Sequence, residues 1–291
     1  MKKNKTSIFV HIFFILFAAI CFIPFLMVIS ASLTESKDLT INGFSVLPRK
    51  VDISAYQYLF ANPKMIIDGY KVTFFITIVG TALGLLVMTL VAYPLSRPRF
   101  KLKKFITWYL FFPTLFGGGM VSSYIVNTRY LKLTDNIWVM IIPGLLNAYH
   151  VFMIRTFFSQ LPEGLFDAAK IDGAGEWRIY STIALRLSKP ILATIAFLGA
   201  LTRWNTWYSG MLYIRSSDKY PLQYLLQRMM LSLEELKRNM LVSPDAVSLS
   251  EMPGENLRMA LLVVCIGPVM LFFPFFQKYF TRGMTVGAVK V

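Results

Sequence analysis

The chain has 291 residues, of which 56% are hydrophobic and 15% aromatic, and its mean hydropathy is positive. This composition places it among polytopic membrane proteins rather than soluble globular domains. The net charge of +15 would suit a nucleic-acid partner. The basic residues lie mainly in short segments beside apolar runs, however, where they orient membrane spans, so no nucleic acid is expected. Cys21 and Cys265 both lie inside apolar runs, which argues against a disulfide framework.

Six apolar runs are long enough to cross a bilayer, whose hydrocarbon core of about 30 Å requires about 20 helical residues. The first run follows a basic tail and resembles a signal peptide. It exceeds the ~7–15 apolar residues of a secretory signal, which favours an uncleaved span. The sequence therefore predicts one all-α transmembrane domain over residues 1–291. Its six transmembrane helices are expected at residues 8–31, 72–95, 105–125, 136–157, 190–212 and 259–279.

The distribution of lysine and arginine predicts the direction of these spans. The loop 96–104 carries five basic residues and no acid, and the N-terminal tail, residues 158–189 and the chain end are also basic. With six spans, these four segments fall on one side, which is then cytoplasmic. Both termini are therefore expected to be cytoplasmic, and the long loop 213–258, which contains an amphipathic helical pattern, is expected outside.

Prolines and glycines are expected to interrupt several spans. In lipid, such breaks are tolerated where neighbouring helices or a water-lined cavity satisfy the freed backbone groups. Close helix packing through small residues is the alternative explanation. The residues concerned are Pro113, Pro143, Pro268, Pro274 and the run Gly117-Gly118-Gly119.

The polar segment 158–189 separates two of these spans and has good helix chemistry. Pro162 suits a first helical position, and Glu163 and Asp167 place negative charge near the positive end of the helix dipole. Gly173 is a natural stop, and a second helical stretch is expected from Gly175, with Trp177, Tyr180 and Ala184 on one side. The segment therefore predicts a helix-turn-helix that presents small residues and one carboxylate to a partner in the water.

The chain carries no recognisable catalytic motif. It has two histidines, so a His-Glu-x-x-His zinc site cannot form, and it has no Gly-x-Ser-x-Gly elbow. The dipeptide Gly-Lys is absent, which excludes a P-loop. We therefore expect a non-catalytic chain with no metal or cofactor of its own, and a membrane-embedded enzyme is excluded as a hypothesis.

The polar segment resembles the cytoplasmic loop of ABC-importer permeases, usually written E-A-A-x3-G-x9-I-x-L-P. Asp167-Ala168-Ala169, Gly173, Ile183 and Leu185 match this spacing, with Asp167 in place of glutamate and Arg186 in place of the final proline. The neighbouring strings IDGA and SKP match the carbohydrate branch, which includes the maltose permeases. The string FPTLFGGGMVSSYIV is also similar to the third span of the branch that takes up oligosaccharides and polysaccharide fragments.

The resemblance implies a permease subunit in the bacterial plasma (inner) membrane. Its expected partners are a second, similar permease, two copies of a cytoplasmic ATPase that bind ATP and Mg, and an extracytoplasmic solute-binding protein. Transport of a carbohydrate would then proceed by alternating access, driven through the loop 162–190. The residues implied in ATPase coupling are Glu163, Asp167, Ala168, Ala169, Asp172, Gly173 and Ala174.

Polar and aromatic residues of two spans are candidates for the substrate path. An intramembrane arginine is a functional candidate by default, aromatic rings can stack on sugars, and amides can bind hydroxyl groups. The alternative for the aromatic residues is an interfacial belt. The candidates are Asn147, Tyr149, Arg203, Trp204, Asn205, Trp207 and Tyr208.

A stand-alone secondary transporter or channel remains the alternative function. Such proteins often contain inverted repeats and intramembrane acids. The sequence shows no clear repeat and no acid well inside a span. Co-purification of an ATPase separates the two hypotheses.

Overall fold

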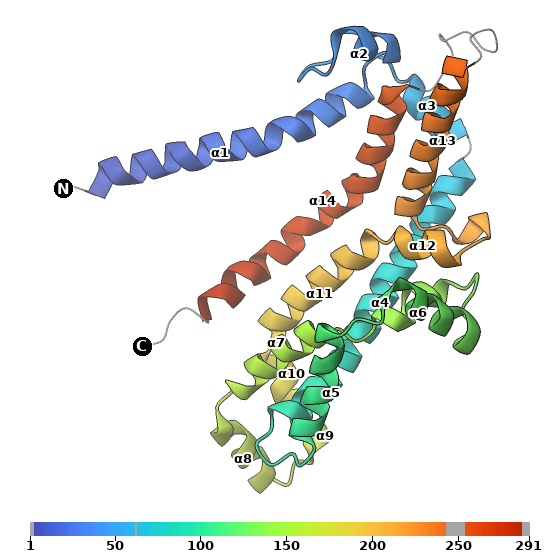
Figure 1. Ribbon diagram of the computed structural model, residues 1–291. Coiled ribbons are helices and arrows are strands. Elements are labelled where there is room, and N and C mark those ends of the chain that lie inside the picture. Colours follow the sequence, from blue (N-terminus) through green and yellow to red (C-terminus); the bar gives the residue numbers. More distant parts are fainter. Residues whose placement is uncertain (1–2, 62, 243–253, 287–291) are drawn as a thin grey trace. The chain divides into compact units, whose positions relative to one another are not determined.

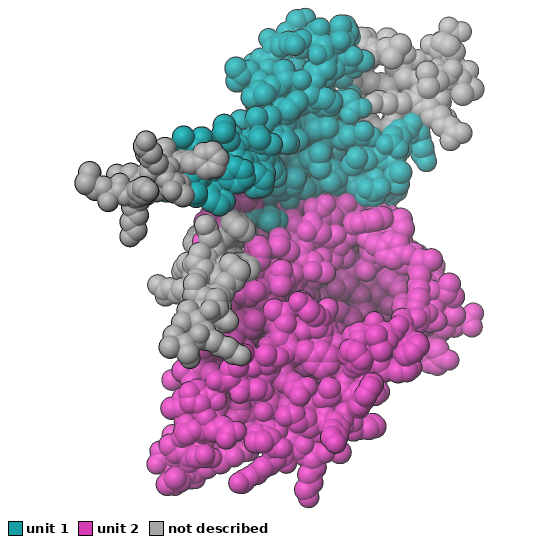
Figure 2. Space-filling model, turned by 60° about the vertical axis from the view of Figure 1, so that its left-hand side comes forward, with its two compact units in different colours: residues 1–67, 225–269 teal, residues 68–224, 270–291 magenta. Residues whose placement is uncertain are grey.

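The computed structural model describes residues 3–61, 63–242 and 254–286 of the chain. It is 79% helical, and these described residues contain no strand, so the predicted all-α class is confirmed (Figure 1). Helices dominate because a chain in lipid must satisfy its backbone hydrogen bonds internally. The chain divides into two compact units, which are coloured separately in Figure 2.

Unit 1 comprises residues 1–67 and 225–269. In it, Thr34 and Val51 pair in an isolated antiparallel bridge, and the hydroxyls of Ser32 and Tyr56 lie 2.8 Å apart. Its helical segments are α1 (Lys3–Ser32), α2 (Ser36–Asn42), α3 (Ser54–Ala61), the start of α4 (Pro63–Ser96), most of α13 (Leu222–Val242) and the first part of α14 (Glu255–Val286).

The helix expected in the loop 213–258 is present as α13. The Ser/Pro-rich stretch that follows it, 243–253, lies outside the described residues, as does the end of the chain, 287–291.

Unit 2 comprises residues 68–224 and 270–291, and it contains most of α4 and the elements between α4 and α13. Three elements of unit 2 are single turns of 3-10 helix and two are π-helical. Its elements in chain order are α5 (Lys103–Leu115), α6 (Gly119–Ile125), η1 (Val126–Tyr130), η2 (Ile137–Met140), η3 (Ile142–Gly144), α7 (Ala148–Ser159), α8 (Glu163–Ile171), α9 (Glu176–Ile179), η4 (Tyr180–Ala184), α10 (Leu185–Leu187), α11 (Lys189–Trp204), α12 (Tyr208–Tyr213) and η5 (Ser217–Lys219).

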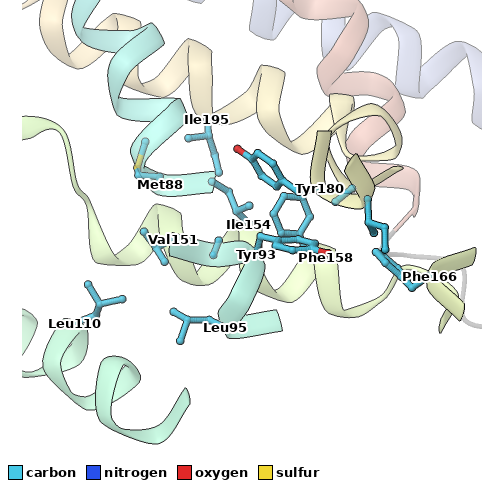
Figure 3. Close-up of a cluster of buried hydrophobic side chains, with 13 residues drawn as sticks. Met88, Tyr93, Leu95, Leu110, Val151, Ile154, Phe158, Phe166, Tyr180 and Ile195 are labelled. Atoms are coloured by element: carbon cyan, nitrogen blue, oxygen red, sulfur yellow. The ribbon is translucent and has the colours of Figure 1, made fainter. Parts of the chain in front are cut away.

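The core of unit 2 lies where α4 meets the polar segment (Figure 3). Phe158 and Ile154 of α7 and Ala92 of α4 have no exposed surface. Phe166 of α8 and Tyr180 of η4 enter the same cluster, so the water-facing segment shares one core with the helices. The other members are Met88, Tyr93, Leu95, Leu110, Val151, Ile179, Ala184 and Ile195.

In the described part of the chain, two helices, Val10–Ser32 and Pro63–Ser96, are long and apolar enough to cross a membrane. If each of three bent helix pairs forms one span, the number of spans rises to five. The predicted count of six is therefore not confirmed. The third expected span is bent by 117° between α5 and α6. This bend falls at the glycine run 117–119 and not at Pro113, which lies inside α5.

The expectation that Pro268 and Pro274 interrupt a span is wrong, because α14 runs without a break from Glu255 to Val286. A proline inside a membrane helix is tolerated where neighbouring helices and local adjustments satisfy the backbone group that it frees. Pro143, by contrast, lies in the short η3, where the chain leaves α-helical geometry before α7.

Candidate functional site

The polar segment forms the predicted helix-turn-helix, which we call the bracket, residues 162–187. α8 starts at Glu163 with Pro162 as its N-cap, one residue later than the sequence suggests. It ends at Ile171, just before the expected stop Gly173, whose φ of +78° favours glycine. The amide of Gly173 donates to Lys170 O at 3.0 Å, and the amide of Ala174 donates to Ala169 O at 2.9 Å.

The second arm of the bracket is α9, followed by the π-helical η4. Of the three residues that were predicted to lie on one side of this arm, Tyr180 and Ala184 are buried, whereas Trp177 is 66% exposed. Ile179 and Tyr180 fill the buried side of this arm, and the Trp177 ring lies outside them, 5.3 Å from the ring of Tyr180. π-Helical turns are rare and occur frequently at functional sites, which favours a functional role for this arm.

Three contacts fasten the bracket to α4 and to Arg97, the residue that follows α4. The Tyr93 hydroxyl donates to Glu176 Oε2 at 2.7 Å, and the hydroxyls of Tyr180 and Thr89 lie 2.8 Å apart. The guanidinium of Arg97 lies 3.8 Å above the Phe166 ring, a cation–π contact. Both arms of the bracket are therefore joined to the same end of α4, so a displacement of the bracket has a direct mechanical path into this helix.

Arg97 also links the bracket to α7. One of its terminal nitrogens donates to the carbonyl of Phe158 at 3.0 Å, and its Nε donates to Ser96 Oγ at 3.1 Å. The arginine thus joins the ends of α4 and α7 while its flat face covers α8. Lysine cannot reproduce this, because it lacks the planar fork.

Glu176 is stabilised as a carboxylate. The hydrogen bond from Tyr93 holds its pKa below the ordinary value of 4.5, and Lys170, whose Nζ lies 3.1 Å from Glu176 Oε1, acts in the same direction. Glu176 therefore remains charged at every physiological pH and keeps the two arms of the bracket together.

A cavity of about 650 Å³ opens between the bracket and the end of α4. Aromatic residues line it, among them Phe100, Phe166 and Trp177, and acids and bases share its rim, including Asp167 and Lys170. Among the described residues, no group of three or more acids, histidines or cysteines is arranged to hold a metal ion.

The bracket presents most of the predicted coupling residues outward. Glu163, Asp167, Ala168, Asp172 and Gly173 are exposed. Ala169 and Ala174 are only partly exposed, because they pack against the core. This surface therefore combines acidic and small side chains, and a Cβ placed on Gly173 would meet nothing within 4 Å.

Two apolar side chains on this surface were not among the predicted coupling residues. Ile171 is 86% exposed, and Trp177 is similarly uncovered. Ile171 follows Asp167 by four residues, so helical spacing already places both on one face of α8. Large apolar side chains exposed on a segment that carries this much charge are typical of a surface that binds a partner.

The structure separates the candidates for the substrate path. Arg203 is buried, with its guanidinium donating to Gly144 O at 2.8 Å, and Trp204 is buried with its ring 5.2 Å from Phe74. The exposed side chain of Asn205 donates to the carbonyl of Leu201 in its own helix.

The other candidates are more accessible. Asn147 caps α7 by accepting from the amide of His150 at 3.1 Å, and Tyr149 is 68% exposed. Trp207 and Tyr208 are 40% and 41% exposed, with their rings 5.7 Å apart, and the Tyr208 hydroxyl contacts the sulfur of Met120. Tyr149, Trp207 and Tyr208 are therefore the candidate rings that leave surface free for a ligand.

A further polar contact, which the sequence did not indicate, joins two loops of unit 2. Asp135, in the left-handed region with φ +55°, accepts from the amides of Arg215 and Ser216, both at 3.0 Å, and from Lys219 Nζ at 3.1 Å. The side chain of Ser216 also donates to it, and this bond is the main reason that the pKa of Asp135 is well below its usual range. Its partners lie 80 or more residues away, so no local pattern shows the contact.

Known proteins resemble the chain over its full length. The Polygalacturonan/rhamnogalacturonan transport system permease protein YtcP of Bacillus subtilis (strain 168) is 34% identical over 290 residues, covering 100% of both chains. The Arabinooligosaccharides transport system permease protein AraQ of Halalkalibacterium halodurans is 29% identical and also covers 100% of both.

A solved structure has the same fold. It is a chain of a bacterial ABC transporter involved in the import of the acidic polysaccharide alginate, with a TM-score of 0.80 and 30% identity. The match covers 96% of this chain and 99% of that one. The family model described as "Binding-protein-dependent transport system inner membrane component" matches residues 1–286. The chain therefore belongs to this family and is a membrane-embedded permease component of an ABC transporter.

Proposed function

We propose that this permease imports oligosaccharides or polysaccharide fragments as one subunit of an ATP-driven, binding-protein-dependent importer. The names of its relatives support this substrate class, since they transport polygalacturonan or rhamnogalacturonan, arabinooligosaccharides and, for the solved structure, alginate. Two of these three names describe acidic polysaccharides, so substrates that contain uronates are the first to test.

The bracket is the proposed coupling site, and its attachment to α4 is the observation that carries this proposal. The exposed Asp167 pairs with a basic residue of a cytoplasmic ATPase, while Ala168, Gly173 and Ile171 enter a groove on that partner. Motion of the docked bracket is passed to α4 through Arg97 and Tyr93. Glu163, Ala169, Asp172 and Ala174 support the same surface.

ATP and Mg bind to the partner in this scheme, not to the permease. The full importer contains a second, similar permease, two ATPase copies and an extracytoplasmic solute-binding protein. The alternative, a stand-alone transporter or channel, predicts that the purified permease brings no ATPase with it. Co-purification from mild detergent, followed by an ATPase assay with and without the oligosaccharide, distinguishes the two.

We extend the proposal to six spans with both termini cytoplasmic, the sixth span being provided by α14. Cysteine labelling in a background without Cys21 and Cys265 tests this arrangement, using exposed positions. Cysteines at Lys101 and Arg178 should react only from the cytoplasm, and one at Ser217 only from outside. Labelling of Arg178 and Ser217 from the same side contradicts the six-span arrangement.

Gly173→Arg is the direct test of docking. A long cationic side chain at the exposed turn should release the ATPase and abolish uptake, while the permease still inserts and folds. Gly173→Asn is the matched control, because asparagine tolerates a left-handed conformation and adds little bulk. The proposal requires Gly173→Asn to keep most uptake, and normal uptake by Gly173→Arg would remove the bracket from the coupling site.

The substrate path is proposed to run past Trp207 and Tyr208, whose exposed rings lie 5.7 Å apart. A ring that stacks on a sugar contributes about 0.5–1.5 kcal/mol by analogy with aromatic pairs, so Trp207→Leu should weaken uptake by several-fold. Trp207→Phe keeps a ring and should lose less. Equal uptake kinetics for both variants and the parent, at matched membrane abundance, remove Trp207 from the path. Asn147, Tyr149, Arg203, Trp204 and Asn205 are the remaining members of the proposed path region.

A further inference from the structure

Arg203 is a buried cation whose hydrogen-bond partners are all backbone carbonyls. Its two terminal nitrogens donate to Gly144 O at 2.8 Å and to Gly199 O at 3.2 Å, and 8% of the residue is exposed. In the described part of the chain, no carboxylate pairs with it and its Nε has no partner. Because charge inside a membrane domain is costly, such an arginine requires an explanation.

Three glycines make room for this side chain. A Cβ placed on Gly80 would lie 2.4 Å from Arg203 Nε, and one on Gly84 would lie 3.0 Å from a terminal nitrogen. Gly199, in the helix of Arg203, would place its Cβ 3.2 Å from the other terminal nitrogen. These residues form a recess, which we call the glycine notch. A residue with any side chain at Gly80 would force the guanidinium to move.

The face of α4 that borders the notch carries polar side chains whose hydrogen bonding is incomplete within the described part of the chain. Thr77, Gly80, Thr81 and Gly84 follow helical spacing, so they share one face of α4. The hydroxyls of Thr77 and Thr81 are buried, and among the described residues they have no hydrogen-bond partner. An apolar side chain in place of Arg203 would avoid the buried charge and its unpaired Nε, which indicates that stability alone does not account for the arginine.

The position of Gly144 connects Arg203 to the substrate-path region. Gly144 ends η3, and α7 begins four residues later, after its cap Asn147. A hydrogen bond to Gly144 O from α11 therefore fixes where this irregular segment lies against α4 and α11. The two acceptors belong to different segments, so a forked donor is needed to reach both.

We propose that Arg203 is a positioning residue for transport. Its guanidinium, seated in the glycine notch, holds η3 and the start of α7 at a fixed distance from α4. This role is independent of which saccharide is carried, because it concerns the spacing of three segments of the permease itself. The simplest competing role is electrostatic, in which the positive charge alone attracts an acidic substrate.

A distance measurement in the complete importer tests the proposal without relying on substrate. Spin labels at Ile78 of α4 and Ile142 of η3, which are 64% and 41% exposed, report the spacing by pulsed dipolar spectroscopy after Cys21 and Cys265 are removed. The parent should give one narrow distribution. Arg203→Ala, Arg203→Lys and Gly80→Ala should each broaden or displace it. Gly267→Ala is the matched control, because a Cβ there meets nothing within 4 Å, and it should leave the distribution unchanged.

Combining two changes separates the notch from ordinary helix packing. In the Arg203→Ala background no long side chain occupies the notch, so Gly80→Ala should have little further effect on the distance. An equal displacement by Gly80→Ala in both backgrounds overturns the proposal, since the glycine would then serve the helices alone. If Arg203→Ala fails to assemble, Arg203→Lys and Gly84→Ala carry the distance test.

Uptake kinetics distinguish positioning from charge. Arg203→Lys keeps the charge but cannot bond both carbonyls, so the maximal rate should fall by several-fold at unchanged half-saturation. Restoration of both the parental rate and the parental distance by lysine would assign Arg203 an electrostatic role and overturn the proposal. A failure of the bracket to bind an ATPase, by contrast, would contradict the proposed function and leave the distance result intact.

Discussion

The two regions of unit 2 that fasten α4 do so by opposite means. At the bracket, α4 and the residue that follows it contribute large side chains, with Tyr93 and Arg97 reaching Glu176, Phe166 and the backbone of α7. At the glycine notch, α4 contributes no side chain at two positions, and a single arginine from α11 fills the space.

This difference predicts different tolerances to substitution. The contacts at the bracket are distributed over several rings and hydrogen bonds, so single losses should be graded. The notch depends on one side chain and on empty volume, so the smallest enlargement, from glycine to alanine, displaces the guanidinium. The bracket, as the proposed docking site for an ATPase, is therefore suited to transmit force through many contacts, and the notch is suited to hold one spacing.

Phe166→Ala should have the largest effect at the bracket. It removes a ring that is 4% exposed, and it deprives Arg97 of its aromatic face, so we expect a loss of about 3–5 kcal/mol in local stability. Thermal unfolding of the purified importer and retention of the ATPase measure it. Phe166→Leu keeps most of the volume and isolates the cation–π contribution. An unchanged unfolding midpoint for Phe166→Ala would mean that α8 does not depend on this core.

The Tyr180–Thr89 contact should respond asymmetrically to its two deletions. Thr89 Oγ1 also approaches Leu85 O at 2.7 Å, so Tyr180→Phe leaves no buried group unsatisfied and should cost about 1 kcal/mol. Thr89→Val instead leaves the buried Tyr180 hydroxyl without its hydrogen-bond partner and should cost about 1–3 kcal/mol. Hydrogen exchange of the η4 amides measures both variants. Equal losses would contradict the asymmetry and indicate that water replaces the threonine.

The local features of the bracket could be predicted from the sequence. The start of α8 and its end just before Gly173 follow from residues within one turn of each helix end, where capping chemistry operates. The breaks in the spans were harder to predict, because helix continuity depends on the packing around each proline. α14 passes through Pro268 and Pro274, whereas the glycine run 117–119 separates two helices.

The contacts that hold the bracket and the glycine notch in place join residues far apart in the sequence, so no local sequence pattern predicts them. Tyr93 and Glu176 are 83 residues apart, and Arg203 and Gly144 are 59 residues apart. The sequence marked Arg203 as functional because of its charge, but the need for a notch on α4 became visible only when Gly80 and Gly84 were placed beside it. The charge of a residue is evident from its own position in the sequence, whereas the space around its side chain depends on several segments that only the fold brings together.

The smallest expected effect concerns the Tyr93–Glu176 hydrogen bond. Its partner carboxylate has 60% of its side chain exposed, and Lys170 also contacts it, so solvent and the lysine compensate in part for the loss. Tyr93→Phe should therefore lower the unfolding midpoint only slightly at neutral pH. Because the bond lowers the pKa of Glu176, its removal should raise that pKa toward the ordinary value of 4.5.

The dependence of this effect on pH follows from the direction of the pKa shift. A carboxyl group whose pKa is lower in the folded state stabilises that state above its unfolded pKa, and this contribution is lost as pH falls through the folded value. The difference in unfolding midpoint between the parent and Tyr93→Phe should thus be constant from neutral pH down to the ordinary glutamate pKa and should shrink below it. In a Glu176→Gln background the same tyrosine substitution should show no such dependence. If the difference is independent of pH in both backgrounds, Tyr93 acts through its packing against Phe158 and Tyr180 rather than through the carboxylate.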